Sequence, residues 1–146
     1  MKILILALVA GLAAPWLAAD TASPLGLWRT IDDETGKARS FVRISEEGGV
    51  LSGRVERIVD PKRQDAVCEK CKDDRQGQRV LGMEIIRDVR ADDDGDSWEG
   101  GEILDPTKGK TYRVKLDLED NGQKLKVRGF VGVSLFGRTQ VWERVE

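Results

Sequence analysis

The sequence has 146 residues, and 34% of them are charged, with 24 basic and 26 acidic side chains. The two signs are interleaved along the chain, so there is no basic face, and nucleic acid is excluded as an expected partner. The chain contains no histidine, which removes histidine-based catalytic triads, the usual zinc hydrolase sites and the most common general base near neutral pH.

The N-terminal segment has the pattern of a secretory signal peptide. A short basic start, Met1-Lys2, precedes the apolar run ILILALVAGLAAPWLA, which ends in small residues. We predict that residues 1–19 form a signal peptide and that residues 20–146 form one exported domain, periplasmic or secreted. An uncleaved membrane anchor is the alternative, but Pro15 would interrupt its helix, so no stable membrane span is expected after processing.

Beyond this segment, apolar residues alternate with polar ones at a period of two. The clearest case is TYRVKLDLE, in which Tyr112, Val114, Leu116 and Leu118 form one face. Strict alternation is typical of half-buried strands, and turn residues separate the runs. We predict eight strands, near 26–31, 39–45, 50–59, 81–89, 97–104, 110–118, 123–131 and 138–145. Short loops imply antiparallel neighbours, so the predicted fold is an all-β, eight-stranded up-and-down barrel, which removes both sheet edges.

The connection from Asp60 to Val80 is long for a hairpin loop, and it holds both cysteines, Cys68 and Cys71. A redox-active pair normally begins a helix that follows a strand, and no helical pattern follows Cys71. A zinc site would need about four ligands, and the chain has no histidine to complete one. The favoured interpretation is a disulfide that stabilises the loop by roughly 2 kcal/mol, with redox and metal roles as alternatives.

An acidic turn, ADDDGDSWEGGE, resembles a calcium loop at first sight. Aligned on Gly95, the EF-hand pattern fails, because Arg90 falls at its first position and Gly101 at its last. We interpret the stretch as a solvated turn between two strands. No metal, cofactor or catalytic residue is therefore assigned from the sequence.

The last strand places polar and aromatic side chains on one face. Arg138, Gln140 and Trp142 lie there by their period of two, as expected for either a polar-edged cavity or structural packing. Together with the other aromatics, they give the candidate ligand-binding residues Trp28, Trp98, Tyr112, Phe130, Arg138, Gln140 and Trp142.

Two resemblances bear on these residues. GLWRT resembles the G-x-W opening of lipocalin-like barrels, which implies that Trp28 packs at the closed end under Arg138 or Arg144. Five ordered blocks, from GLWRT to FGRTQVWERV, resemble the uncharacterised bacterial exported domain-of-unknown-function family 2147. That resemblance implies a small secreted lipocalin-like barrel without an established activity, and it fits the disulfide because the cysteine pair lies in one of the blocks.

Three function classes follow from the sequence. The leading one is a non-enzymatic barrel that binds a small apolar or amphipathic ligand in its interior, by analogy at fold level. The second is an envelope interaction module that contacts a protein partner through the charged 60–80 loop. The third is an enzyme, either a thiol redox protein using Cys68 and Cys71 or a carboxylate-based hydrolase.

Overall fold

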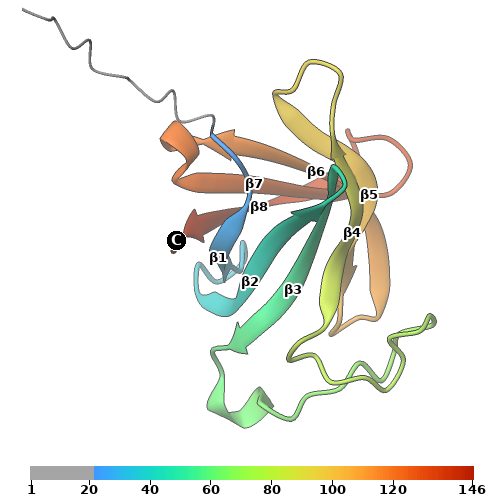
Figure 1. Ribbon diagram of the computed structural model, residues 1–146. Helices are drawn as coiled ribbons and strands as arrows, with labels where there is room; N and C mark the ends of the chain where they lie inside the picture. Colours follow the sequence, from blue (N-terminus) through green and yellow to red (C-terminus); the bar gives the residue numbers. More distant parts are fainter. Residues whose placement is uncertain (1–21) are drawn as a thin grey trace, which may run out of the picture.

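The computed structural model describes residues 22–146, so the predicted signal peptide lies outside the described residues. Eight strands follow one another in antiparallel order and close into a barrel in which β1 pairs with β8 (Figure 1). The predicted eight-stranded antiparallel barrel is confirmed. The strands are β1 (Gly26–Ile31), β2 (Ala38–Glu47), β3 (Val50–Ile58), β4 (Glu84–Ala91), β5 (Ser97–Asp105), β6 (Lys110–Glu119), β7 (Lys124–Phe130) and β8 (Gly137–Arg144).

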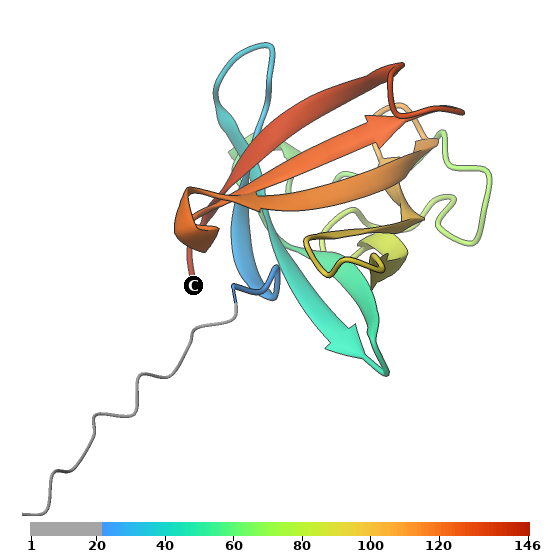
Figure 2. The same ribbon diagram turned by 90° about the horizontal axis from the view of Figure 1, so that it is seen from above.

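The strand bounds follow the alternation of apolar residues and the turns between the runs. In β6, Val114 and Leu116 point inward and are buried, whereas Thr111 and Arg113 point outward and are exposed. Figure 2 shows β6, β7 and β8 side by side as one wall of the barrel. Only β4 departs clearly from its predicted range, since it begins at Glu84 rather than near residue 81.

The barrel closes unevenly between β1 and β8. Their ladder pairs Trp28 with Arg144 and Arg29 with Glu143, and Leu27 adds backbone hydrogen bonds to the residues that follow β8. In contrast, β7 and β8 pair from Lys124 to Phe130. Beyond Arg29, toward the β1–β2 loop, side chains continue the closure. There the Arg138 guanidinium donates hydrogen bonds to Asp33. We call this part of the barrel wall the β1–β8 seam.

The packed core fills the end of the barrel where β1 begins. Trp28 and Trp142 are its largest fully buried side chains, and Ile44, Leu116 and Leu125 pack with them. Arg144 covers this end, with its guanidinium 4.3 Å from the centre of the Trp28 ring. Burial of these apolar side chains is the main source of stability for the fold.

The connection between β3 and β4, residues 59–83, lies at the opposite end and includes a short 3₁₀ helix, η1 (Pro61–Arg63). Cys68 and Cys71 form a disulfide within it, with Cα atoms 5.5 Å apart, as the sequence predicted. Both cysteines are buried. We call residues 59–83 the disulfide segment.

The disulfide segment is held against the turn between β5 and β6. At Gly109, whose φ is +63°, an added Cβ would lie 2.2 Å from the carbonyl of Lys70. Glycine is therefore required there by both backbone conformation and close approach. Within residues 22–146, no helix is long and apolar enough to cross a membrane.

Candidate functional site

The barrel contains a cavity of about 760 Å³ between the packed core and the disulfide segment. All eight strands contribute to its lining, through Thr30, Ser40, Val55, Ile85, Ile103, Tyr112, Val127 and Gln140 among others. Trp142 also lines the cavity, and because it belongs to the packed core as well, it forms part of the cavity floor. The volume lies within the range of roughly 300–1,000 Å³ that is typical of small-molecule sites.

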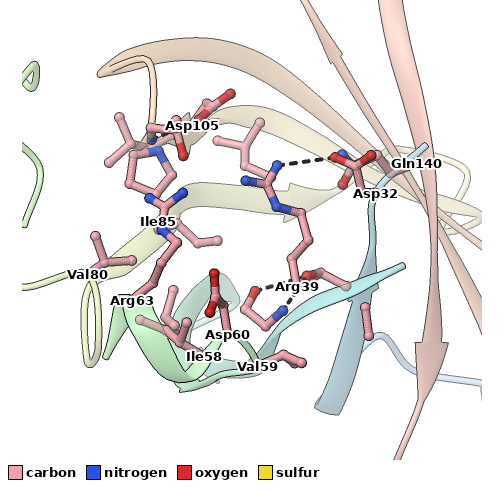
Figure 3. A pocket seen from close by; sticks show the side chains of 18 of the residues that line it. Asp32, Arg39, Ile58, Val59, Asp60, Arg63, Val80, Ile85, Asp105 and Gln140 are labelled. Atoms are coloured by element: carbon pink, nitrogen blue, oxygen red, sulfur yellow. Dashed lines mark hydrogen bonds and ion pairs between the residues drawn. The ribbon is translucent and has the colours of Figure 1, made fainter. Parts of the chain in front are cut away.

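The disulfide segment supplies part of the cavity wall. Ala66 and Val80 line the cavity, and their backbones are joined by a hydrogen bond from Val80 N–H to the Ala66 carbonyl. Figure 3 shows Asp60 and Arg63 projecting from the same segment into the cavity mouth. The cysteine pair therefore stabilises a segment that shapes the site.

Two ion pairs organise the charges at the mouth. Arg39 donates to Asp32 at 3.2 Å, as Figure 3 shows, and hydrogen bonds from the backbone and hydroxyl of Thr35 lower the pKa of Asp32. Arg138 donates to Asp33 at 2.7 Å. This hydrogen bond lowers the pKa of Asp33 and raises that of Arg138. Both carboxylates are therefore ionised and paired near neutral pH.

Polar side chains also lie deeper in the cavity. Thr30 and Ser40 face each other across β1 and β2, with their hydroxyl oxygens 2.9 Å apart. Gln140 accepts a hydrogen bond from the indole N–H of Trp142 at 3.0 Å and donates to Asp33 at 3.4 Å. The interior thus combines apolar surface with a few fixed hydrogen-bonding groups, as in small-molecule sites generally.

The structure brings four of the seven candidate ligand-binding residues to the cavity. Tyr112, Arg138, Gln140 and Trp142 line it. Phe130 is half-buried at the end of β7 and is not among the lining residues. Trp98 is partly buried against the packed core and does not line the cavity either.

Trp28 lies at the closed end of the barrel and does not line the cavity. Its ring is fully buried, its indole N–H donates to the Pro24 carbonyl at 2.8 Å, and Arg144 stacks on it. Of the two arginines left open by the G-x-W resemblance, Arg144 is therefore the partner. Arg138 instead pairs with Asp33 in the β1–β8 seam.

Several lining residues were not found by sequence reasoning. Thr30, Ser40, Asp32 and Arg39 line the cavity, but each has a polar side chain in a strand or turn where polar residues normally face solvent. The alternation of β2 could have indicated Ser40, because Ser40, Val42 and Ile44 are two residues apart and therefore lie on the same face of the strand, where Val42 and Ile44 are buried. A polar residue at an inward position marks an interior that is not wholly apolar.

The acidic turn and the cysteine pair carry no reactive arrangement in the described residues. Asp92 accepts hydrogen bonds from the backbone of Asp96 and from the backbone and hydroxyl of Ser97, and so orders the β4–β5 turn. The Cys68 and Cys71 side chains are almost fully buried, whereas thiol–disulfide exchange needs an accessible sulfur. Both features therefore have a structural explanation.

Comparisons with known proteins agree with this architecture. A solved structure of HP1028 from Helicobacter pylori, described as belonging to the lipocalin family, superposes with a TM-score of 0.74 and 22% sequence identity, covering 86% of this chain and 85% of that one. The fold is therefore lipocalin-like. Comparison with curated proteins finds no match. The family model described as "Uncharacterized protein conserved in bacteria (DUF2147)" matches residues 26–144, and the chain thus belongs to that family.

Proposed function

We propose that the protein is exported and binds a small amphipathic ligand in the barrel cavity. The observation that carries the proposal is the cavity itself, which has about 760 Å³ of space, apolar residues from the strands and charged residues around the mouth. An apolar ligand portion would replace water against side chains such as Val55, Ile103 and Val127. A polar portion would meet the charged mouth.

The mouth contains one arginine suited to an anionic group. Arg39 and Arg138 are already paired with Asp32 and Asp33. Among residues 22–146, Arg63 has no hydrogen bond or ion pair from its side chain, and it projects into the mouth. Lys37 and Lys108 also line the cavity, but a guanidinium can bind a carboxylate through two parallel hydrogen bonds and an ammonium cannot. We therefore assign the anionic contact to Arg63 and give Arg138 the role of closing the seam.

The disulfide segment belongs to this site. As a protein-docking loop it would project from the barrel, but Ala66 and Val80 line the cavity and Gly109 holds the segment against the neighbouring turn. This packing favours a ligand-binding role for the segment. The presence of a disulfide in a small bacterial domain also supports export.

Ligand binding is tested by titrating the purified mature protein with dodecanoate while recording tryptophan fluorescence. Trp142 lines the cavity, so its emission should shift when ligand displaces water, whereas Trp28 and Trp98 lie outside the lining. Lipid extraction of the purified protein should also release a co-purifying amphiphile. A spectrum that stays constant with linear and polycyclic amphiphiles alike, and with every extracted compound, would contradict the proposal.

A cavity-filling variant provides the matched comparison. Gly129 lines the cavity, and a Cβ there would make only ordinary contacts, the nearest 3.4 Å from the Tyr112 Cβ. Gly129→Leu should therefore fold, fill part of the cavity and weaken binding by about tenfold or more. Lys126→Leu places the same side chain on the outer face of β7 and should leave binding unchanged.

Export is tested separately. The protein recovered from the extracytoplasmic fraction should have an N-terminus near Asp20, as removal of residues 1–19 requires. Recovery of the chain only in the cytoplasm, with residues 1–19 still present, would contradict export without affecting the ligand-binding proposal.

A further inference from the structure

The wall of the cavity has two chemically different sides. Three strands that are adjacent around the closed barrel, β8, β1 and β2, together with the β1–β2 turn, supply most of the polar lining residues of the barrel interior. The remaining strands, β3 to β7, supply a mainly apolar lining, with Asp105 and Tyr112 as its polar members. The polar side consists of Thr30, Asp32, Ser40, Arg138 and Gln140, and the apolar side of Val55, Ile58, Ile85, Ile103 and Val127.

The polar side retains hydrogen-bonding capacity directed at the cavity. Thr30 and Ser40 have two hydroxyl protons between them, but their side chains make only one hydroxyl-to-hydroxyl hydrogen bond, of 2.9 Å. The backbone N–H of Ser40 donates to the Thr30 hydroxyl and uses no hydroxyl proton. One hydroxyl proton is thus left for an acceptor in the cavity.

Gln140 has a similar free donor. Its carbonyl oxygen accepts from Trp142, and one amide N–H points to Asp33 at 3.4 Å. An amide group has two N–H bonds, and no other hydrogen bond from this amide is made within residues 22–146. Thr30, Ser40 and Gln140, from three adjacent strands, therefore supply hydrogen-bonding groups on one wall of the cavity.

A linear amphiphile does not match this wall. A fatty acid has one polar group at its end, so its methylenes would lie against Thr30 and Ser40 and remove water from their hydroxyls without replacing the hydrogen bonds. Such unpaired burial is unfavourable. A ligand with polar groups along one long face and an apolar opposite face would satisfy both walls.

We propose that the ligand is a facial amphiphile, a rigid polycyclic molecule with hydroxyl groups along one face, of the chemical class represented by deoxycholate. This inference rests on the proposed ligand-binding function and specifies its ligand class. The hydroxyl face lies against β8, β1 and β2, and the ring face lies against β3 to β7. An anionic end lies at the mouth beside Arg63.

The test compares three anions below their micelle-forming concentrations. Deoxycholate has both the rings and the hydroxyl groups, cholanate has the same rings and carboxylate without the hydroxyl groups, and dodecanoate is linear. Because each has one carboxylate, a difference in affinity does not come from charge. We expect deoxycholate to bind about tenfold more tightly than cholanate or dodecanoate, which corresponds to ~1.4 kcal/mol.

The paired substitutions Thr30→Val and Ser40→Ala remove both hydroxyls while keeping similar volumes. They should lower deoxycholate affinity about tenfold and raise cholanate affinity, because its rings then no longer bury hydroxyls without a hydrogen-bond partner. If the double variant does not fold, the comparison of the three anions in the unaltered protein decides alone.

Equal affinities for deoxycholate and cholanate, or tightest binding of dodecanoate, would overturn this inference and leave the proposed function intact. Absence of binding by all three probes, and by the compounds extracted from the protein, would overturn both.

Discussion

Arg144 is a partly buried cation that has no carboxylate partner within residues 22–146. Its guanidinium stacks on Trp28 and donates to the carbonyls of Gly122, Leu25 and Ser23. Burial lowers the pKa of Arg144, but an arginine stays protonated at any pH at which the barrel would be studied. The residue therefore connects the start of β1, the β6–β7 turn and the closed end of the core.

Replacing Arg144 by lysine should be strongly destabilising although it conserves the charge. A lysine ammonium cannot reproduce the planar stacking and the separate directions of three donors. We expect Arg144→Lys to lower the free energy of unfolding by about 2 kcal/mol, measured by urea denaturation. Arg29→Lys is the control, because the Arg29–Glu143 pair is solvent-exposed and such pairs contribute little. Equal losses in the two variants would contradict the special role of Arg144.

At the scale of single residues, the sequence predicted the type of contact better than its partner. The G-x-W resemblance placed Trp28 under an arginine, yet Arg138 and Arg144 lie on the same face of the last strand and are equivalent by parity. The pairing of Trp28 with Arg144 across β1 and β8 distinguishes them. That register depends on barrel closure, which a single strand does not encode.

The β1–β8 seam gives the barrel an acid-sensitive element. Backbone pairing ends at Arg29, and the ion pair of Asp33 with Arg138 continues the closure. The hydrogen bond from Arg138 holds the pKa of Asp33 below its ordinary value of 3.8. A carboxyl with a lowered folded-state pKa contributes stability that is complete above pH 3.8 and is lost as the pH falls through the folded-state value.

We therefore expect Asp33→Asn to be less stable than the unaltered protein at neutral pH, with the difference shrinking as the pH falls below about 4. The measurement is a series of urea denaturation midpoints from pH 7 to pH 2.5. Asp93→Asn, at an exposed site in the β4–β5 turn, should show little difference at any pH. A difference for Asp33→Asn that is the same at both ends of the series would exclude the ion pair as its cause.

The contact between the disulfide segment and the β5–β6 turn leads to a prediction about Gly109. Gly109→Ala would combine a positive φ with a clash against the Lys70 backbone, so we expect a loss of about 3 kcal/mol in the free energy of unfolding. Gly48→Ala is the matched control, because Gly48 also has a positive φ, +58°, but nothing within 4 Å of the added Cβ. Its expected loss is about 1 kcal/mol.

The two glycine variants should also differ in ligand binding. Moving the disulfide segment displaces Ala66 and Val80 from the cavity wall, so Gly109→Ala should weaken binding, whereas Gly48 lies in the β2–β3 turn away from the cavity. Titration with deoxycholate and dodecanoate measures both effects. If Gly109→Ala binds as tightly as Gly48→Ala, the disulfide segment is not part of the ligand site.

Elements were predictable where a local pattern determines them. The strands were found because alternation and turn residues are local signals, and the cysteine spacing indicated a local disulfide. The path of residues 59–83 was not predictable, because it depends on close contact with Gly109, which is distant in sequence. The burial of Arg75 was not predictable for the same reason. A charged residue in a charged loop is expected at the surface, but Arg75 is buried and pairs with Asp73 and Glu102.

At the scale of the whole molecule, the sequence indicated a barrel but not whether its interior is filled. Inward residues alternate in the same way in packed and hollow barrels, and the free volume depends on how side chains from all eight strands meet. Here large residues such as Trp28 and Trp142 fill one end. At the other end Gly129 and Ser40 are small, and the cavity extends there.

Because the cavity is lined by all eight strands, ligand binding is coupled to the stability of the whole barrel. A ligand that binds only the folded state raises the free energy of unfolding by about 2.7 kcal/mol at a concentration of 100 times its Kd. We expect a stabilisation of this size with whichever of deoxycholate and dodecanoate binds more tightly. The measurement is thermal unfolding followed by circular dichroism. The apparent Kd from fluorescence should predict the concentration dependence of the shift.

Gly129→Leu should separate stability from binding. Without ligand the variant should be more stable by about 1 kcal/mol, because glycine in a strand loses more conformational entropy on folding and the new side chain occupies free space. With ligand it should show little further stabilisation, since the same side chain takes the ligand's place. Lys126→Leu should keep the full ligand-dependent shift. A full shift in Gly129→Leu as well would place the bound molecule outside the cavity, because only a ligand that shares the space beside Gly129 competes with the added leucine.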